Sequence, residues 1–229
     1  MQIEPQPLTK QAFAPFGDVI DIPTEAGRKY YEDALGNLRA EARPSLSLSL
    51  KAETPDRPLR AELLERHEFS SQSFVPIDVA RWLIVVAPHA AKGGPDTSAV
   101  RAFIATGRQG VTYKPNTWHH GLTVLDKPGR FAVFMWRTGI KDDEEFVPID
   151  AARWLIVVAP HARQGGPDTG AIKAFIATGR QGVTYRANTW HHGLTTLDRP
   201  GRFAVFMWRT GTGGDEEFVP VEPFTIRIP

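Results

Sequence analysis

The 229-residue sequence contains no cysteine, which excludes disulfide bonds, thiolate zinc sites and cysteine nucleophiles. It also lacks an excess of charge of one sign, because 27 Lys and Arg residues are balanced by 26 Asp and Glu residues, a formal net charge of +1. Such a balance gives no reason to expect a surface for nucleic acid or for an anionic membrane. We therefore expect neither of these partners, and a small-molecule substrate instead.

Long hydrophobic runs are absent as well. No uninterrupted apolar stretch approaches the roughly 18 residues that a membrane-spanning helix needs. Residues 1–10 contain Glu4 and two prolines where a signal peptide requires an apolar core. The remaining composition, 41% hydrophobic and 23% charged, is that of an ordinary globular protein. We expect a soluble, cytoplasmic protein of one to two domains.

An internal duplication dominates the chain. Residues 74–145 recur as residues 146–217, and the two copies differ at 13 of 72 aligned positions. Two copies are too few for a solenoid, which needs about three or more units to bury a shared core. Removing one copy leaves 157 residues, a normal size for a single domain. We interpret residues 1–145 as one domain, residues 146–217 as the second copy, and residues 218–229 as the tail of the first domain.

The local patterning is that of β-strands. Leu46, Leu48 and Leu50 alternate with serines, which is the period of a half-buried strand. Lys127-Pro128-Gly129 predicts a tight hairpin turn. Helix signals are weak and predict only single turns, one after Thr9 and one at Asp96 or Thr97. Further strands are predicted over residues 82–87, 102–105, 110–113, 121–125 and 131–136, over their equivalents in the second copy, and over residues 224–228.

Many short strands at close spacing predict an all-β fold, namely a sandwich, a jelly roll or a small barrel. The segment from Glu65 to Gln72 adds a chemical signal, because Glu65 and His67 point to the same face of an extended strand. A turn of four residues then leads to Gln72. This spacing resembles the first motif of cupins, His-x-His followed after four residues by Glu, with Glu65 and Gln72 as replacements.

A second stretch, from Pro115 to His120, resembles the second cupin motif, Pro-x-Gly-x-x-His, and places His120 at the last ligand position. His119 and His120 cannot both line one cavity on a regular strand, and the motif spacing favours His120 as the inward residue. Imidazole, carboxylate and amide oxygen together suit Ni, Fe, Mn or Zn. The alternative is that these histidines are hydrogen-bonded interior residues of a β protein.

Several longer sequence segments resemble the ureidoglycolate lyase family. They occur in the order of that family and cover essentially the 157-residue unduplicated chain; they are residues 12–20, 64–67, 72–76, 101–104, 109–113 and 116–120. The resemblance implies a cupin-like β-barrel (a jelly roll, or double-stranded β-helix), usually assembled as a homodimer or a higher homo-oligomer. It also implies cleavage of (S)-ureidoglycolate to glyoxylate and urea, late in allantoin and purine degradation, with nickel as the associated cofactor.

The expected site follows from that chemistry. Glu65, His67, Gln72 and His120 are predicted to surround a divalent metal, and a metal next to the substrate hydroxyl lowers the pKa of that hydroxyl. A general acid should protonate the departing urea nitrogen, so Glu65 and His120 are the predicted catalytic residues. The predicted substrate-binding residues are Lys51 for the carboxylate, Asn116 for the ureido group and Trp118 for the pocket wall.

The duplication repeats the second motif without the first, so His192 could replace His120 and we expect one complete site per chain. The copy that lacks the N-terminal half should expose an apolar face, and we expect it to pair with its equivalent in another chain or with the first copy. Two other functions remain open at this point. One is an amidohydrolase that releases ammonia from the same substrate; the other is a non-catalytic binding or scaffold protein.

Overall fold

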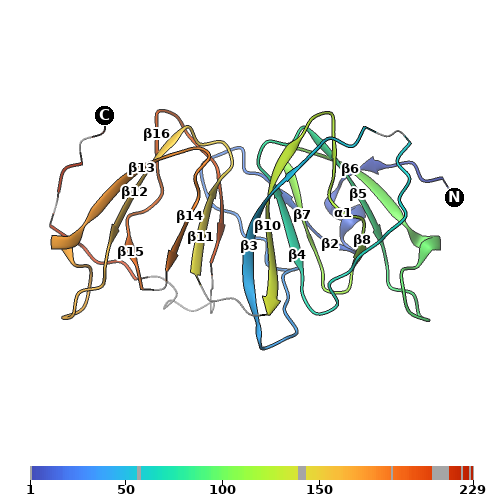
Figure 1. Cartoon of the computed structure of the whole chain (residues 1–229), viewed down its shortest axis with the longest axis horizontal. Helices are drawn as coiled ribbons and strands as arrows, with labels where there is room; N and C mark the ends of the chain where they lie inside the picture. The colour runs from blue at the N-terminus through green and yellow to red at the C-terminus, as the bar shows by residue number, and fades with distance from the viewer. Residues whose placement is uncertain are drawn as a thin grey trace. The chain divides into compact units, whose positions relative to one another are not determined.

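The chain folds into two compact units, Met1–Lys141 and Asp142–Pro229 (Figure 1). The structure is a computed structural model, and it describes residues 2–55, 58–138, 143–186, 188–207, 217–222, 224–226 and 228. The boundary between the units falls just before the second sequence copy. The assignment of the tail 218–229 to the first domain stays a prediction.

The first unit is built almost entirely from short strands. Its elements are β1 (Gln6–Pro7), α1 (Lys10–Phe13), β2 (Gly17–Asp21), β3 (Ala42–Lys51), β4 (Gln72–Pro76), β5 (Arg81–Ala87), η1 (Thr97–Ala99), β6 (Arg101–Thr106), β7 (Gln109–Tyr113), β8 (Trp118–His119), β9 (Thr123–Leu125) and β10 (Gly129–Thr138). The two helical turns begin where capping residues predicted them. Thr9 accepts a hydrogen bond from the backbone N–H of Ala12, and Asp96 accepts one from that of Ser98.

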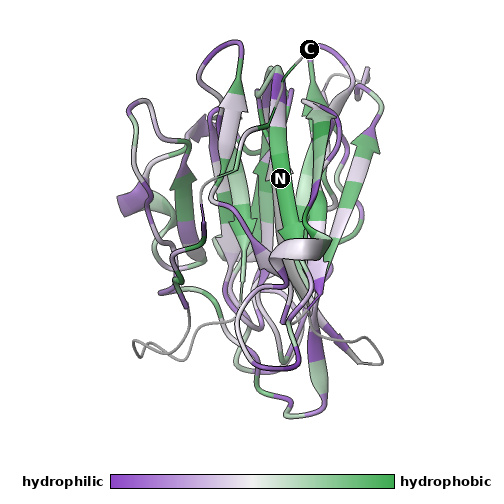
Figure 2. Ribbon diagram, turned by 90° about the vertical axis from the view of Figure 1, so that its left-hand side faces the viewer, coloured by the Kyte–Doolittle hydropathy of each residue, from purple (hydrophilic) through white to green (hydrophobic). Residues whose placement is uncertain are grey.

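Two sheets make up this unit. One has the strand order β1-β6-β5-β8 with β9 also on β5, and the other has the order β2-β7-β4-β10-β3. Large apolar side chains that are almost fully buried form one core, among them Phe13, Trp82, Phe103, Val111 and Phe131. Figure 2 shows apolar residues concentrated on the strands and hydrophilic residues in the connecting loops. The predicted all-β, cupin-like fold is thus confirmed.

The segment Lys127-Pro128-Gly129 is not a hairpin turn. β9 pairs with β5 in one sheet, whereas β10 pairs with β3 and β4 in the other. The segment therefore carries the chain between sheets. Turn residues indicate a change of direction but not the next pairing partner, so the prediction of a hairpin was wrong.

The second unit repeats the strands of the first copy. Its elements are β11 (Asp143–Pro148), β12 (Arg153–Ala159), η2 (Thr169–Ala171), β13 (Lys173–Thr178), β14 (Val183–Arg186), β15 (Trp190–His191), β16 (Thr195–Leu197) and β17 (Phe203–Phe206). They form two sheets, β14-β11-β17 and β13-β12-β15 with β16 on β12. Within the described part of this unit, no strand takes the places of β1, β2 and β3.

Two further findings concern the whole chain. The strand predicted over residues 224–228 is wrong for the described residues of that stretch, which have no regular secondary structure. No helix among the described residues is both long and apolar enough to cross a membrane.

Candidate metal centre

Backbone pairing brings the two sequence motifs together. Glu65 and His119 exchange two hydrogen bonds, each N–H donating to the opposite carbonyl at 2.8 Å, and the N–H of Asn116 donates to the carbonyl of His67 at 2.8 Å. The segment from Glu65 to His67 therefore runs beside the residues that lead into β8. Residues directly opposite in an antiparallel pair project their side chains to the same face. This register sets the side chain of His119 next to that of Glu65.

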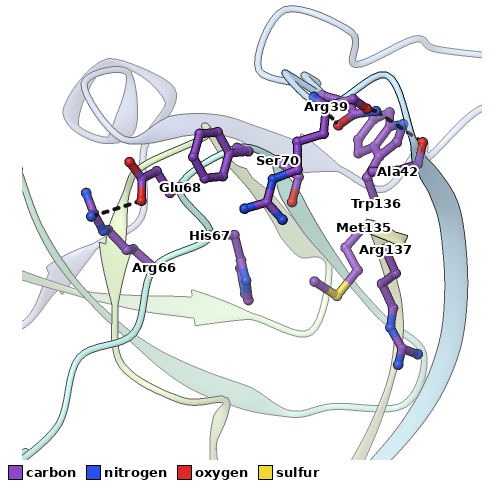
Figure 3. A pocket seen from close by; sticks show the side chains of 11 residues that line it. Arg39, Ala42, Arg66, His67, Glu68, Ser70, Met135, Trp136 and Arg137 are labelled. Carbon is purple, nitrogen blue, oxygen red and sulfur yellow. Dashed lines mark hydrogen bonds and ion pairs between the residues drawn. The ribbon is translucent and has the colours of Figure 1, made fainter. Parts of the chain in front are cut away.

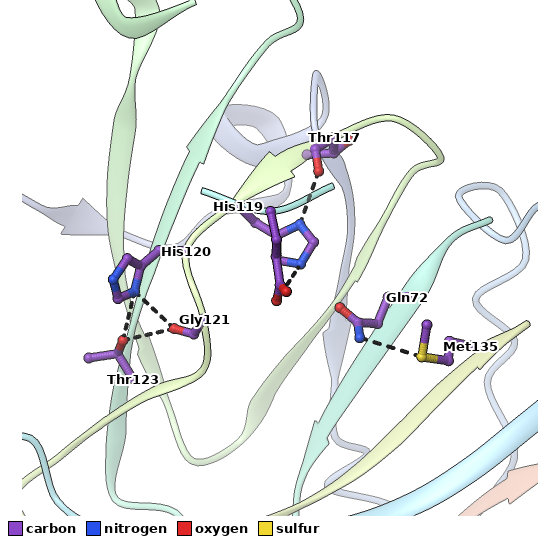
Figure 4. Close-up of polar contacts among 8 residues, drawn as sticks. Gln72, Thr117, His119, His120, Gly121, Thr123 and Met135 are labelled. Atoms are coloured by element: carbon purple, nitrogen blue, oxygen red, sulfur yellow. Dashed lines mark hydrogen bonds and ion pairs between the residues drawn. The ribbon is translucent and has the colours of Figure 1, made fainter. Parts of the chain in front are cut away.

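The inward histidine is His119, not His120. The side chain of His119 is 1% exposed, and its ring stacks on Tyr113 with centroids 4.3 Å apart. The Nδ1 atom of His120 instead contacts the Gly121 carbonyl and the Thr123 hydroxyl (Figure 4). The prediction followed motif spacing, whereas the outcome is decided by strand alternation combined with the register to Glu65, which the sequence does not display.

Three potential ligand residues meet at this point. One ligand atom each from Glu65, His67 and His119 can be chosen so that all lie within 4.8 Å of one another. Nε2 of His67 and Nε2 of His119 are buried and have no hydrogen-bond partner. Because buried polar atoms are nearly always satisfied, two unpartnered nitrogens aimed at one point indicate a missing ligand.

The hydrogen bond on the other ring nitrogen fixes the tautomer of His119. Its Nδ1 lies 3.0 Å from the carbonyl of Thr117, which can only accept, so Nδ1 carries the proton. Nε2 then presents a lone pair 3.5 Å from Oε1 of Glu65. A ring nitrogen oriented in this way is the usual form of a metal-binding histidine.

Gln72 supplies a fourth donor. Its amide nitrogen donates to the sulfur of Met135 at 3.7 Å, and its buried Oε1 has no partner. Figure 4 shows the amide oxygen turned toward the side on which His119 lies. Two imidazoles, one carboxylate and one amide oxygen fit a divalent cation of the first transition series.

The surroundings of the candidate ligands favour the protonation states in which these side chains can bind a metal ion. The pKa of His67 is lowered, mainly by burial and to a smaller extent by the neighbouring His119, so its ring stays neutral. A proton on Nε2 of His119 would hydrogen-bond to the Glu65 carboxylate and lower the pKa of that carboxylate, and in the metal-binding form the cation would take the place of this proton. Burial raises the pKa of Tyr113, so this phenol remains protonated.

A cavity of about 470 Å³ opens next to His67 (Figure 3). Its polar wall contains Arg39, Arg66, Glu68 and Arg137, and Met135 contributes the sulfur that also contacts Gln72. Three arginines against one glutamate leave this wall with an excess of positive charge. The space and the charge suit a small anion close to the cluster of donors.

The three predicted substrate-binding residues do not line this cavity. Lys51 ends β3 nine residues beyond Ala42, which does line it, and at about 3.3 Å per residue that distance is about 30 Å. Asn116 adopts a positive φ of 67° as a turn residue, and its Oδ1 accepts from Nη1 of Arg66. Nε1 of Trp118 donates to Nδ1 of His89 at 3.0 Å.

Arg66, which was not predicted from the sequence, attaches the Glu65–His67 segment on the side opposite to the cluster of ligands. Arg66 donates to Asn116 and to Glu68, contacts Nδ1 of His89, and lies 5.1 Å from the centre of the Trp118 ring. His89 stacks on Trp118. The strand period places Arg66 opposite to Glu65 and His67, a signal that was available but unused.

The second unit repeats only part of this arrangement. His191 stacks on Tyr185 with centroids 4.2 Å apart, and His192 contacts Gly193 and Thr195 as His120 contacts its neighbours. His191 is exposed, whereas its counterpart His119 is buried. In the part of the chain that the structure describes, only the first copy joins the Glu65–His67 segment, so His192 does not replace His120.

Comparison with known proteins agrees with this architecture. The family described as ureidoglycolate lyase matches residues 1–145 and again residues 143–227. A putative ureidoglycolate lyase of Agrobacterium fabrum is 39% identical over 144 residues, which are 63% of this chain and 88% of the relative. A ureidoglycolate lyase of Pseudomonas fluorescens SBW25 is 35% identical over 165 residues, 68% of this chain and 96% of the relative. The chain therefore belongs to the ureidoglycolate lyase family.

Proposed function

We propose that this protein cleaves ureidoglycolate into glyoxylate and urea, as part of allantoin and purine degradation. The observation that carries the proposal is the convergence of Glu65, His67 and His119, with the unpartnered amide oxygen of Gln72 turned to the side of His119, next to a positively charged cavity. These residues lie in the unit that covers most of the first family match. Ureidoglycolate is a small anion with a hydroxyl group next to its carboxylate, and its size and charge suit that cavity.

The four donors would hold the cofactor. We propose nickel on the strength of the family resemblance, and the same donor set also accommodates Zn, Mn or Fe. When bound, a divalent cation supplies Lewis-acid polarisation of the substrate hydroxyl. The protein residues then have to move one proton and exclude competing orientations of the substrate.

The proton balance of the reaction needs no water. The hydroxyl proton leaves, the carbon–oxygen double bond forms, the carbon–nitrogen bond breaks, and the urea nitrogen gains one proton. Glu65 belongs to the cluster of possible metal ligands and its side chain is 58% exposed, so we assign to its carboxylate the role of accepting the hydroxyl proton and delivering it to the departing nitrogen. His67 and His119, which point their free nitrogens inward, hold the cation and leave that proton to Glu65.

The test is product analysis with matched histidine variants. The metal-loaded protein should release glyoxylate and urea in equal amounts from racemic ureidoglycolate, and His67→Ala and His119→Ala should lower kcat/KM by more than about 100-fold. His191→Ala, the same change at the equivalent position of the second copy, should leave kcat/KM unchanged. Ammonia in place of urea would establish the amidohydrolase, and no turnover with any divalent metal would establish a non-catalytic protein.

The predicted assembly also remains a proposal. We propose a homodimer or a higher homo-oligomer, supported by the family resemblance and by exposed apolar residues such as Phe175, which is 52% exposed. Light scattering of the purified protein should give at least twice the 25.4 kDa mass of one chain. A monodisperse monomer would contradict this proposal without affecting the proposed chemistry.

A further inference from the structure

One cation on the cavity wall is held in place without an anionic partner. The guanidinium carbon of Arg39 lies 4.1 Å from the centre of the Phe69 ring, a cation–π contact. Figure 3 shows the side chain of Arg39 reaching into the cavity above His67. No carboxylate among the described residues forms an ion pair with it. A positioned and uncompensated guanidinium is a ready site for an anion.

The backbone around Arg39 is fixed by a network of hydrogen bonds. Its N–H donates to Oδ1 of Asn37 at 3.1 Å, and its carbonyl accepts from Nδ2 of the same residue at 2.8 Å. On the neighbouring position, the N–H of Leu38 donates to the carbonyl of Phe69 at 2.7 Å. The loop that carries Arg39 is therefore tied to the residue whose ring supports the guanidinium, which lowers the entropy cost of binding.

The other arginines of the cavity are less suited to the same role. Arg66 already donates to Asn116 and to Glu68. Arg137 lies directly opposite Arg43 in the β3–β10 pair. Arg39 and Arg137 are both exposed, but among the described contacts only Arg39 has an aromatic ring to support it. Among the described residues, Arg39 is thus the arginine of this wall that has no ion pair and is also held by an aromatic ring.

We propose that Arg39 binds the carboxylate of the substrate and thereby selects 2-hydroxy acid anions over uncharged analogues. This inference rests on the proposed function, since it assigns the substrate carboxylate to a residue of that same site. A guanidinium presents parallel N–H donors that match both oxygens of a carboxylate, so binding can be bidentate. With the carboxylate held at Arg39, the hydroxyl-bearing carbon is directed toward His67 and the other donors.

The kinetic test compares Arg39→Gln and Arg39→Lys with Arg108→Gln, an exposed arginine in the turn between β6 and β7. Arg39→Gln should raise KM for ureidoglycolate about 10- to 100-fold, because a hydrogen bond to a charged group is lost, with a smaller change in kcat. Arg39→Lys should recover part of the loss, and Arg108→Gln should match the wild type. Bound metal should remain one ion per chain in every variant.

A binding test separates this inference from the proposed function. Glycolate and its uncharged amide glycolamide are titrated into the metal-loaded full chain. The wild type should prefer glycolate by at least about 10-fold, and Arg39→Gln should abolish the preference even if no lyase activity exists. Unchanged glycolate affinity in Arg39→Gln, or loss of the preference in Arg137→Gln instead, would overturn the assignment.

Discussion

At the residue scale, the tandem histidines show how much one step along a strand changes. His119 is buried against Tyr113 and next to Glu65, whereas its neighbour His120 contacts Gly121 and Thr123. We expect His119→Ala to lower metal affinity by more than about 100-fold and His120→Ala to change it by less than about 5-fold. Equilibrium dialysis of both variants measures this difference. Equal losses would show that both rings bind the cation.

The lowered pKa of His67 predicts a pH dependence of stability. A histidine ordinarily titrates at pH 6.5, and its folded-state pKa here is lower, so the unfolded state binds more protons in acid. The contribution of the neutral ring to the free energy of unfolding is therefore present above pH 6.5 and is lost as the pH falls. Glu65, whose pKa is also lowered, acts in the same direction below its ordinary pKa of 4.5.

Urea unfolding of the metal-free protein at several pH values between 8 and 5 measures this effect. The wild type should lose stability below pH 6.5, and His67→Gln should lose less over the same interval. Parallel curves for the two proteins would mean that another group controls the acid sensitivity.

At the element scale, the duplication provides pairs of residues with the same local sequence and different surroundings. Phe103 on β6 is fully buried and packs edge-on against Phe13 of α1, with centroids 5.6 Å apart. Phe175 on β13 occupies the equivalent position and is 52% exposed. The strand forms in both copies and pairs with the equivalent neighbour, β5 or β12, so the N-terminal segment is not needed for the strand. The N-terminal segment is what buries the ring.

This difference predicts unequal effects of one substitution. Phe103→Ala should lower the free energy of unfolding by about 3–5 kcal/mol, because it leaves a cavity in the core. Phe175→Ala should change it by less than about 0.5 kcal/mol, as at other exposed positions. Chemical denaturation of the full chain measures both values. A large effect at Phe175 would show that this ring is covered in solution, for example by a second copy of the chain.

The short Glu65–His67 segment depends on Arg66 for its attachment to the residues around β8. Arg66→Ala removes the donor to Asn116 and the contact with Trp118, but leaves all four candidate ligands in place. We expect metal affinity to fall about 10- to 100-fold through loss of orientation. Metal titration in parallel with Arg81→Ala, which removes a surface ion pair with Asp126, provides the control. Equal affinities of the two variants would exclude a positioning role.

At the scale of the whole molecule, the chain contains two copies of the His-bearing strand and one Glu65–His67 segment. The number of cations bound per chain should therefore be one, and His191→Ala should not change it. At a free metal concentration of 100 times the dissociation constant, binding should stabilise the first unit by about 2.7 kcal/mol. Metal analysis after dialysis and thermal unfolding with and without chelator check both values. Two tightly bound ions per chain would contradict the single site.

The amino-acid sequence by itself determined the duplication, the absence of cysteine chemistry and most of the strands, and it indicated Glu65, His67 and Gln72 as candidate donors. The capping residues Thr9 and Asp96 are local signals, and each produced the expected helical turn. The alternation of Leu46, Leu48 and Leu50 produced the expected strand β3, but Leu48 and Leu50 are 61% and 71% exposed, so the expected burial of the leucine face was wrong for these two residues. The period of an extended chain predicted a common face for Glu65 and His67, and the two residues do come together in the cluster, although the segment forms only an isolated bridge at Glu65 and not a strand.

Only the tertiary structure decided which histidine faces inward, which copy joins the N-terminal segment, and which arginine of the cavity is supported by an aromatic ring. His119 is selected by its register opposite Glu65, and Arg39 by the ring of Phe69, 30 positions further along the chain. Both are contacts between segments distant in sequence. Such contacts depend on how sheets pack and on which strands pair, and no local propensity or motif spacing contains that information.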